Sequence, residues 1–209
     1  SPGAEITSVD VSVPSLEEAR ERVRAGPGNV SFLQADIHSL PFRDGTFDHA
    51  FVCFVLEHLP DPVRALGCLR RVLRPEGTIT VIEGDHGSAF FYPDSAAARK
   101  AIGCLIELQR EKGGNALIGR EIFPLLSAAG YRGVSVSPRM VYVDAGHPEL
   151  VEGFTKKTFT AMVEGVRDEV LGRGLMSAGE FGQGIRDLYR TCEPDGTFCY
   201  TFFKGTGVR

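Results

Sequence analysis

Two aspartates stand where an α/β protein would bind a nucleoside. Asp10 lies at the end of the β-branched run Ile6–Val11, and Asp36 directly follows the run Val30–Ala35. Ligands of open α/β sheets bind outside the carboxyl ends of the strands. There Asp10 can accept hydrogen bonds from two vicinal ribose hydroxyls, and Asp36 can accept one from an adenine amine. A single strand-end aspartate more often caps a turn, but the pair in this order favours a nucleoside site.

A second polar group follows another expected strand, Thr78–Ile82. Glu83, Asp85 and His86 bring three titratable side chains to that strand end, and we take them as candidate catalytic residues. They would act as a base only if the reacting group of the substrate must lose a proton. The alternative is that Asp85 caps a turn and His86 is a solvated loop residue.

Alternating strand and helix patterns in the first half would position these residues. A capping-box pattern at Ser15 and Glu18 predicts one helix start, and Asp61 before Pro62 predicts another. The continuous apolar run Asp48–Val55 suits a strand buried on both faces. This alternation predicts parallel strands with right-handed crossovers, at Ile6–Val11, Val30–Ala35, Asp48–Val55 and Thr78–Ile82.

The second half is mainly helical and ends in two β-runs. We expect Val134–Val143 to be a strand at an edge or with a bulge, because it contains Pro138, and Thr197–Phe203 to pair with it antiparallel. Helices are expected at Ser95–Lys112, Glu121–Ala129, Glu149–Gly172 and Ser177–Thr191. The whole, residues 1–209, is interpreted as one domain with helical insertions at about 88–130 and 145–195.

Composition excludes several classes of protein. The 209 residues carry 23 basic and 27 acidic side chains, a net charge of −4 with no basic run, which argues against nucleic-acid binding. The longest apolar stretches, such as Ala50–Leu56, are too short to span a bilayer, and no export leader is visible. The five cysteines have no metal-ligand spacing, so we predict reduced thiols, no metal site and a cytoplasmic protein.

Several short motifs together resemble class I S-adenosylmethionine-dependent methyltransferases. The sequence is most similar to the type 11 group, which includes ubiquinone/menaquinone-biosynthesis methyltransferases. The resemblance implies a Rossmann-like α/β fold with a seven-stranded, mostly parallel sheet whose last strand is antiparallel. It rests on Asp10, Ala35-Asp36-Ile37, Leu40-Pro41-Phe42, Phe47-Asp48, Val55-Leu56-Glu57-His58-Leu59, Leu73-Arg74-Pro75-Glu76-Gly77-Thr78 and the closing hydrophobic hairpin.

The resemblance also implies a cofactor, S-adenosyl-L-methionine, and a small-molecule acceptor. Asp10 would bind the ribose, Asp36 and Ile37 the adenine, and Val11 would pack on the adenine ring. Cys53 and Phe54 would face the methionine part of the cofactor, Phe54 being equally plausible as a core residue. His58 would organise its loop or, less often, contact the cofactor.

One departure from the family pattern concerns its first strand and glycine-rich loop. Both should precede Ile6, yet only Ser1–Glu5 stand there. That loop normally supplies backbone N–H groups for the carboxylate end of the cofactor. We therefore expect a sheet without its central strand, and a chain that is not a competent enzyme unless that segment is supplied.

The acceptor side and two competing functions stay open. The helices around 95–112 and 149–172 would cap the acceptor, and Arg120 and Arg139 would bind an acidic group on it or form salt bridges. An apolar lining or, alternatively, ordinary helix-packing core is expected from Phe90, Phe91, Tyr92, Phe154, Phe159 and Met162. The competing classes are a non-catalytic methyltransferase-like binding or scaffold protein and a nucleotide-dependent dehydrogenase.

Overall fold

Six strands form two sheets in the computed structural model, which describes residues 3–24, 26 and 28–209. One sheet has two strands, β1 (Ile6–Asp10) and β2 (Val30–Gln34). The other has four in the order β3-β4-β6-β5, which are β3 (Phe47–Cys53), β4 (Leu73–Tyr92), β5 (Arg132–Val143) and β6 (Thr197–Val208).

Strand directions agree with the sequence-based expectation. β1 runs parallel to β2, and β3 runs parallel to β4. β6 is antiparallel to both of its neighbours, so the predicted pairing of Thr197–Phe203 with Val134–Val143 is confirmed. β5 is the edge strand, which explains how Pro138 is tolerated there. Within the described residues β1 and β3 are not hydrogen-bonded, so the two sheets are separate.

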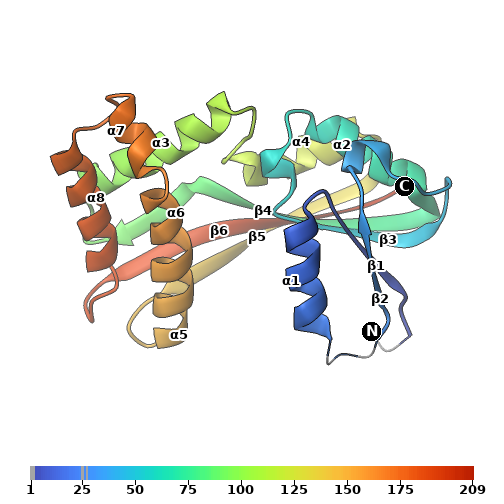
Figure 1. Ribbon diagram of the computed structural model, residues 1–209, viewed down its shortest axis with the longest axis horizontal. Coiled ribbons are helices and arrows are strands. Elements are labelled where there is room, and N and C mark those ends of the chain that lie inside the picture. Colours follow the sequence, from blue (N-terminus) through green and yellow to red (C-terminus); the bar gives the residue numbers. More distant parts are fainter. Residues whose placement is uncertain (1–2, 25, 27) are drawn as a thin grey trace.

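The strand β4 is much longer than the predicted Thr78–Ile82. It begins at Leu73 and continues to Tyr92, because its last residues pair with Thr197–Cys199 of β6 after a register shift. β4 and β6 therefore run along the length of the molecule, joining the helices at its two ends (Figure 1). The residues Glu83–Gly87 lie within this strand and not in a loop.

Helices pack at both ends of the long strands. α2 (Pro62–Val72) and α4 (Ile122–Ala128) lie at one end, and α3 (Ala96–Glu111), α6 (Ala161–Glu164), α7 (Arg167–Gly172) and α8 (Ala178–Arg190) lie at the other (Figure 1). The remaining helix α1 (Val13–Val23) crosses from β1 to β2. Short helical turns are α5 (Pro148–Leu150) and the 3-10 turns η1 (Ile37–Ser39), η2 (Leu56–His58) and η3 (Ile118–Glu121). None of the described helices has the length and apolar character needed to cross a membrane.

Helix starts follow local capping rules with one correction. Ser177 and Glu180 form the predicted capping box of α8, and Asp61 caps α2. The predicted start at Ser15 is wrong, because Ser12 accepts a hydrogen bond from the Ser15 amide and α1 begins at Val13. The predicted helix Glu149–Gly172 is divided into α5, the π-helix η4 (Val151–Thr160), α6 and α7.

Two hydrophobic cores correspond to the two ends of the molecule. One lies between the four-stranded sheet and the pair α2 and α4, and includes Leu56, Leu66 and Ile79. The other lies under α3, α6 and α8 and contains Phe159 and Phe198. The carboxyl end of β3 lies beside the middle of β4, where Cys53 pairs with Ile82, and this junction is the place to look for chemistry.

Candidate functional site

An apolar cavity of about 280 Å³ separates the two sheets. Its walls come from β1 on one side and from β3 and α2 on the other, including Val9, Phe51 and Val72. The cavity also contacts four of the predicted cofactor residues, namely Asp10, Val11, Asp36 and Ile37. The structure therefore brings together the two aspartates and the two apolar residues that follow them.

Each of these aspartates caps a turn with one oxygen. Asp10 Oδ1 accepts a hydrogen bond of 2.8 Å from the Ser12 amide, and Asp36 Oδ1 accepts one of 2.8 Å from the His38 amide. Within the described residues the second oxygen of each carboxylate makes no hydrogen bond, and both side chains are exposed. The turn-capping role and a ligand-binding role are thus compatible, because the turn fixes the carboxylate while one oxygen stays available.

Cys53 ends the strand β3, and Phe54 directly follows it. Phe54 has φ +55°, a left-handed conformation that costs of order 1–2 kcal/mol for a residue with a side chain. Its amide donates to the Ile82 carbonyl at 3.0 Å, and its ring is 44% exposed. Burial raises the pKa of the Cys53 thiol. Neither residue contacts the cavity, whereas their neighbours Val52 and Val55 do.

Glu83 holds the turn that follows Phe54. Its side chain is fully buried, and Oε1 accepts hydrogen bonds from the amides of Val55 (3.0 Å) and Leu56 (2.8 Å). Oε2 is buried without a partner among the described residues. Burial raises the pKa of Glu83 to about 7, against the opposing effect of the two amides. The geometry makes this predicted catalytic candidate an anchor of the turn.

Asp85 is committed to an ion pair. Arg120 donates from Nε to Oδ2 (2.6 Å) and from its terminal nitrogen to Oδ1 (2.8 Å), while the Gly87 amide also donates to Oδ1 at 3.0 Å. Of the two roles considered for Arg120, the structure shows the salt bridge. Asp85 also caps a turn, as its own alternative expected. Arg139, in contrast, is exposed on β5 and forms no ion pair within the described part of the chain.

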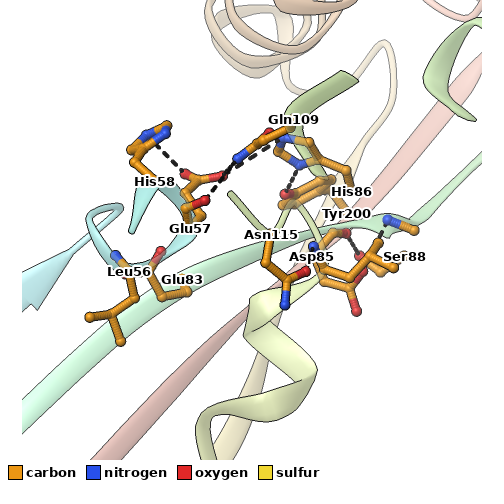
Figure 2. Close-up of polar contacts among 12 residues, drawn as sticks. Leu56, Glu57, His58, Glu83, Asp85, His86, Ser88, Gln109, Asn115 and Tyr200 are labelled. Carbon is orange, nitrogen blue, oxygen red and sulfur yellow. Dashed lines mark hydrogen bonds and ion pairs between the residues drawn. The ribbon is translucent and has the colours of Figure 1, made fainter. Parts of the chain in front are cut away.

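His86 is buried, so the alternative of a solvated loop residue is wrong. Its Nδ1 lies 2.6 Å from the Tyr200 hydroxyl oxygen, and its Nε2 lies 4.0 Å from Glu57 Oε2 without a hydrogen-bond partner in the described residues. Figure 2 shows His86 between these two side chains. Burial lowers the pKa of His86, which favours the neutral ring, and burial raises the pKa of Tyr200.

Sequence reasoning missed two members of this polar cluster. Glu57 is nearly buried, and Gln109 Nε2 donates to its Oε2 at 3.2 Å. Tyr200 comes from a strand 114 residues after His86. Glu57 stood only within a family motif, and Tyr200 only within an apolar β-run. A polar residue inside an apolar run was the one signal available for each.

The aromatic residues expected at the acceptor divide between core and surface. Phe91 and Phe159 are buried, and Phe154 and Met162 pack against the same core, as the core alternative expected. Phe90 and Tyr92 are exposed on β4. These side chains do not form a common lining.

Comparison with known sequences gives one family match and several relatives. A family model described as a methyltransferase domain (type 11) matches residues 1–81. Demethylmenaquinone methyltransferase of Thermus thermophilus is 43% identical over 82 residues, which are 39% of this chain and 37% of that protein. An uncharacterized 37.1 kDa protein of transposon TN4556 from Streptomyces fradiae is 34% identical over 167 residues, 79% of this chain and 47% of its own. The chain thus spans less than half the length of both relatives.

Comparison with solved structures confirms the fold class. The YcgJ protein of Bacillus subtilis has a TM-score of 0.59 at 18% identity, covering 97% of this chain and 81% of that one. A Haemonchus contortus phosphoethanolamine N-methyltransferase 2, solved with phosphomonomethylethanolamine and S-adenosylhomocysteine, has a TM-score of 0.56 at 15% identity. It covers 99% of this chain and 44% of its own length. These likenesses show a Rossmann-like α/β fold.

Proposed function

Residues 1–81 belong to the type 11 group of class I S-adenosylmethionine-dependent methyltransferases, and from this premise we propose that the chain binds S-adenosylmethionine and transfers its methyl group to a small molecule. The observation that carries the proposal is the placement of Asp10 and Asp36 together at one apolar cavity, each with a free carboxylate oxygen. A dehydrogenase needs only the first of these acids, so the pair favours the methyltransferase.

The residues at the cavity fit the adenosine half of the cofactor. A carboxylate oxygen at Asp10 suits the vicinal ribose hydroxyls, and the one at Asp36 suits the adenine amine. Val11 and Ile37 supply apolar contacts for the base next to these acids. The turn after β3, anchored by Glu83, would border the methionine half through Cys53 and Phe54.

The cofactor supplies a methyl group already activated on a sulfonium centre, so the protein has little bond chemistry to perform. What the chain must do is hold an acceptor close, aligned and shielded from water. The anchored turn at the end of β3 is suited to this, because its backbone is fixed by hydrogen bonds to Glu83 and Ile82 of β4.

The finer proposal concerns the acceptor. The relative from Thermus thermophilus is named for demethylmenaquinone, and it is 43% identical to this chain over 82 residues. We therefore favour an aromatic, quinol-like acceptor, and 1,4-naphthoquinol is the simplest soluble probe of that class.

Two linked measurements test the proposed function. With the glycine-rich segment that the family pattern places before Ile6 supplied, isothermal titration with S-adenosylmethionine should show binding, and methyl-labelled cofactor should then transfer its label to 1,4-naphthoquinol under reducing conditions. Absence of cofactor binding under these conditions would contradict the proposal. Binding without transfer to any member of a quinol, phenol and amine panel would instead support the non-catalytic alternative.

A further inference from the structure

The end of the four-stranded sheet that lies under α3, α6 and α8 is apolar on both faces. One row across β4, β6 and β5 is buried in the core and consists of Phe91, Phe198 and Val143. The next row consists of Phe90, Cys199 and Tyr142, and its side chains point to the opposite face, because side chains alternate along a strand. An antiparallel sheet with one face in water normally shows a polar outward row. An apolar outward row is typical of a sheet that is covered on both faces.

Four large side chains on this outward face are exposed. They come from β4 and β5, have between 49% and 64% of their surface exposed, and are Phe90, Tyr92, Met140 and Tyr142. We call them the aromatic face. Cys199 of β6 lies between Phe90 and Tyr142 in the register and is only 1% exposed, so the patch is continuous across the three strands. A continuous apolar patch on a single chain is often an interaction surface.

The first and last strands place the ends of the described chain away from the aromatic face. The aromatic face lies at the start of β6, whereas β1 and the end of β6, marked C in Figure 1, lie at the opposite end of the molecule. A segment that continued from either end of the chain would have to cross the molecule to cover the aromatic face. The cavity near Asp10 and Asp36 also lies at that opposite end, between β1 and β3. A separate molecule can therefore cover the aromatic face and leave the cavity open.

Charged side chains next to the aromatic face form pairs within the chain. The ion pairs there are Arg99 with Asp94 (2.7 Å) and Arg190 with Asp195 (2.7 Å), and Asp144 lies 3.0 Å from His147. Pairs of both signs disfavour a partner that binds by charge, such as nucleic acid or an anionic membrane. In a symmetric dimer each rim meets its own copy, and internal pairing limits the repulsion between like charges. The paired rim therefore favours a second copy of this chain as the occupant.

We propose that the aromatic face is the interface of a two-fold symmetric homodimer. The outward faces of the two sheets pack against each other about 10 Å apart, with Phe90 and Tyr142 of one copy interdigitating with the same residues of the other. A two-fold interface brings the same surface of both copies together, which is the commonest way in which identical chains associate. The inference does not depend on the proposed function, because the cofactor cavity lies outside the interface.

The size of the aromatic face predicts a dimer of moderate affinity. Aromatic side chains bury about 150–250 Å² each when fully enclosed, so three half-exposed rings and Met140 offer about 400 Å² per copy. Two copies bury about 800 Å² of apolar surface, and a surrounding polar rim brings the total to the ~1,200 Å² at the lower end of specific interfaces. We therefore expect a dimer Kd of about 1–100 µM.

Sedimentation velocity on the full chain gives the first test. Raising the protein concentration from about 1 µM to about 500 µM should convert monomer to dimer without larger species, because a two-fold interface is closed. Monomer at every concentration would overturn the inference. Species that continue to grow beyond the dimer would also overturn it, since they require an open, head-to-tail contact.

Hydroxyl-radical labelling then locates the interface in the wild-type chain. Met140 and Tyr142 should be labelled about threefold less in the dimer than in the monomer, because their side chains become buried. Phe123 on α4, which is 56% exposed in the other half of the molecule, is the reference and should be labelled equally in both states. Protection of Phe51 on β3 without protection of the aromatic face would mean that the chain associates through the free edge of β3, against the inference.

Two substitutions test the side chains themselves. Phe90→Lys and Met140→Lys should each raise the dimer Kd about tenfold or more, because the two-fold axis brings the added charges of both copies close together. Phe123→Lys changes the same residue type at a matched exposure outside the interface and should leave the Kd unchanged. Circular dichroism checks that each variant is folded, and the labelling of the wild-type chain decides the question for any that is not. An unchanged Kd in both folded lysine variants would contradict the assignment.

Discussion

The two halves of the molecule hold their polar residues in opposite ways. Around Asp10 and Asp36 the strands β1 and β2 have no buried residue, and short local turns fix the carboxylates. Around His86 and Tyr200 the side chains are buried, and they are fixed by contacts between strands that are far apart in the sequence. Local turns can be recognised in a sequence, whereas a long-range polar cluster cannot. The first site therefore follows from sequence motifs, and the second needs the structure.

Removing a large aromatic ring should give the largest difference in stability loss between the two halves of the molecule. Phe159 is fully buried and packs on Phe198, Tyr200 and His86, so Phe159→Ala should lower the free energy of unfolding by about 3–5 kcal/mol. The matched change Phe32→Ala removes a half-buried ring from β2 and should cost about 1–2 kcal/mol. Urea denaturation monitored by circular dichroism measures both. Equal losses would contradict the contrast between a packed half and an open one.

Titration of Glu83 should produce the next largest effect. Its pKa is about 7 in the folded chain and near 4.5 when exposed, so the folded state keeps a proton that the unfolded state releases. The resulting stabilisation is fully present below about pH 4.5 and is lost as pH rises through 7. It amounts to about 3 kcal/mol from the size of the shift.

The variant Glu83→Gln isolates this contribution. The difference in unfolding free energy between wild type and Glu83→Gln should change by about 3 kcal/mol, in favour of the variant, from pH 4.5 to pH 8. Glu193→Gln, at an exposed position, should show no such change. A constant difference between wild type and Glu83→Gln over this range would show that the buried carboxyl does not titrate as the geometry implies.

Loss of the Arg120 side chain should have a moderate effect. Arg120→Ala leaves the nearly buried Asp85 carboxylate without its cation, and we expect a loss of about 2 kcal/mol in unfolding free energy. Because Arg120 is itself half-exposed, the loss should be below that of a fully buried pair. Arg139→Ala, which removes an unpaired exposed arginine from β5, should stay within about 0.5 kcal/mol of wild type. Similar losses from both variants would contradict the assignment.

Local features of the fold could be predicted from the sequence, and features set by distant contacts could not. The cap at Ser177 and the antiparallel pairing of Thr197–Phe203 were predicted correctly, because a cap is local and a strongly β-prone run favours pairing in a sheet. The strand β4 was predicted too short, since residues 83–87 were taken to follow the strand. In the structure they lie within it, and Gly84 is required there because a Cβ would collide with the Tyr200 hydroxyl.

Part of the candidate site could be predicted from the sequence, as part of the fold could. Asp10 and Asp36 meet at one cavity as expected, and their contact with a cofactor stays a prediction. The placement of Glu83, Asp85 and His86 at a strand end was wrong, since all three are buried inside β4, and their catalytic role stays a prediction. Their surroundings come from β6, α3 and η3, and no spacing within the sequence encodes those contacts.

The most direct test of the account is the affinity for S-adenosylhomocysteine of wild type, Asp10→Asn and Asp168→Asn, measured by isothermal titration on chains supplied with the glycine-rich segment that the family pattern places before Ile6. Asp10→Asn keeps the size of the side chain but removes the charge from the oxygen available to a ribose, so binding should weaken about tenfold, which is ~1.4 kcal/mol. Asp168 is exposed on α7, away from the cavity, and its variant should bind like wild type. Equal affinity in all three proteins would contradict the assignment of Asp10 to the cofactor site.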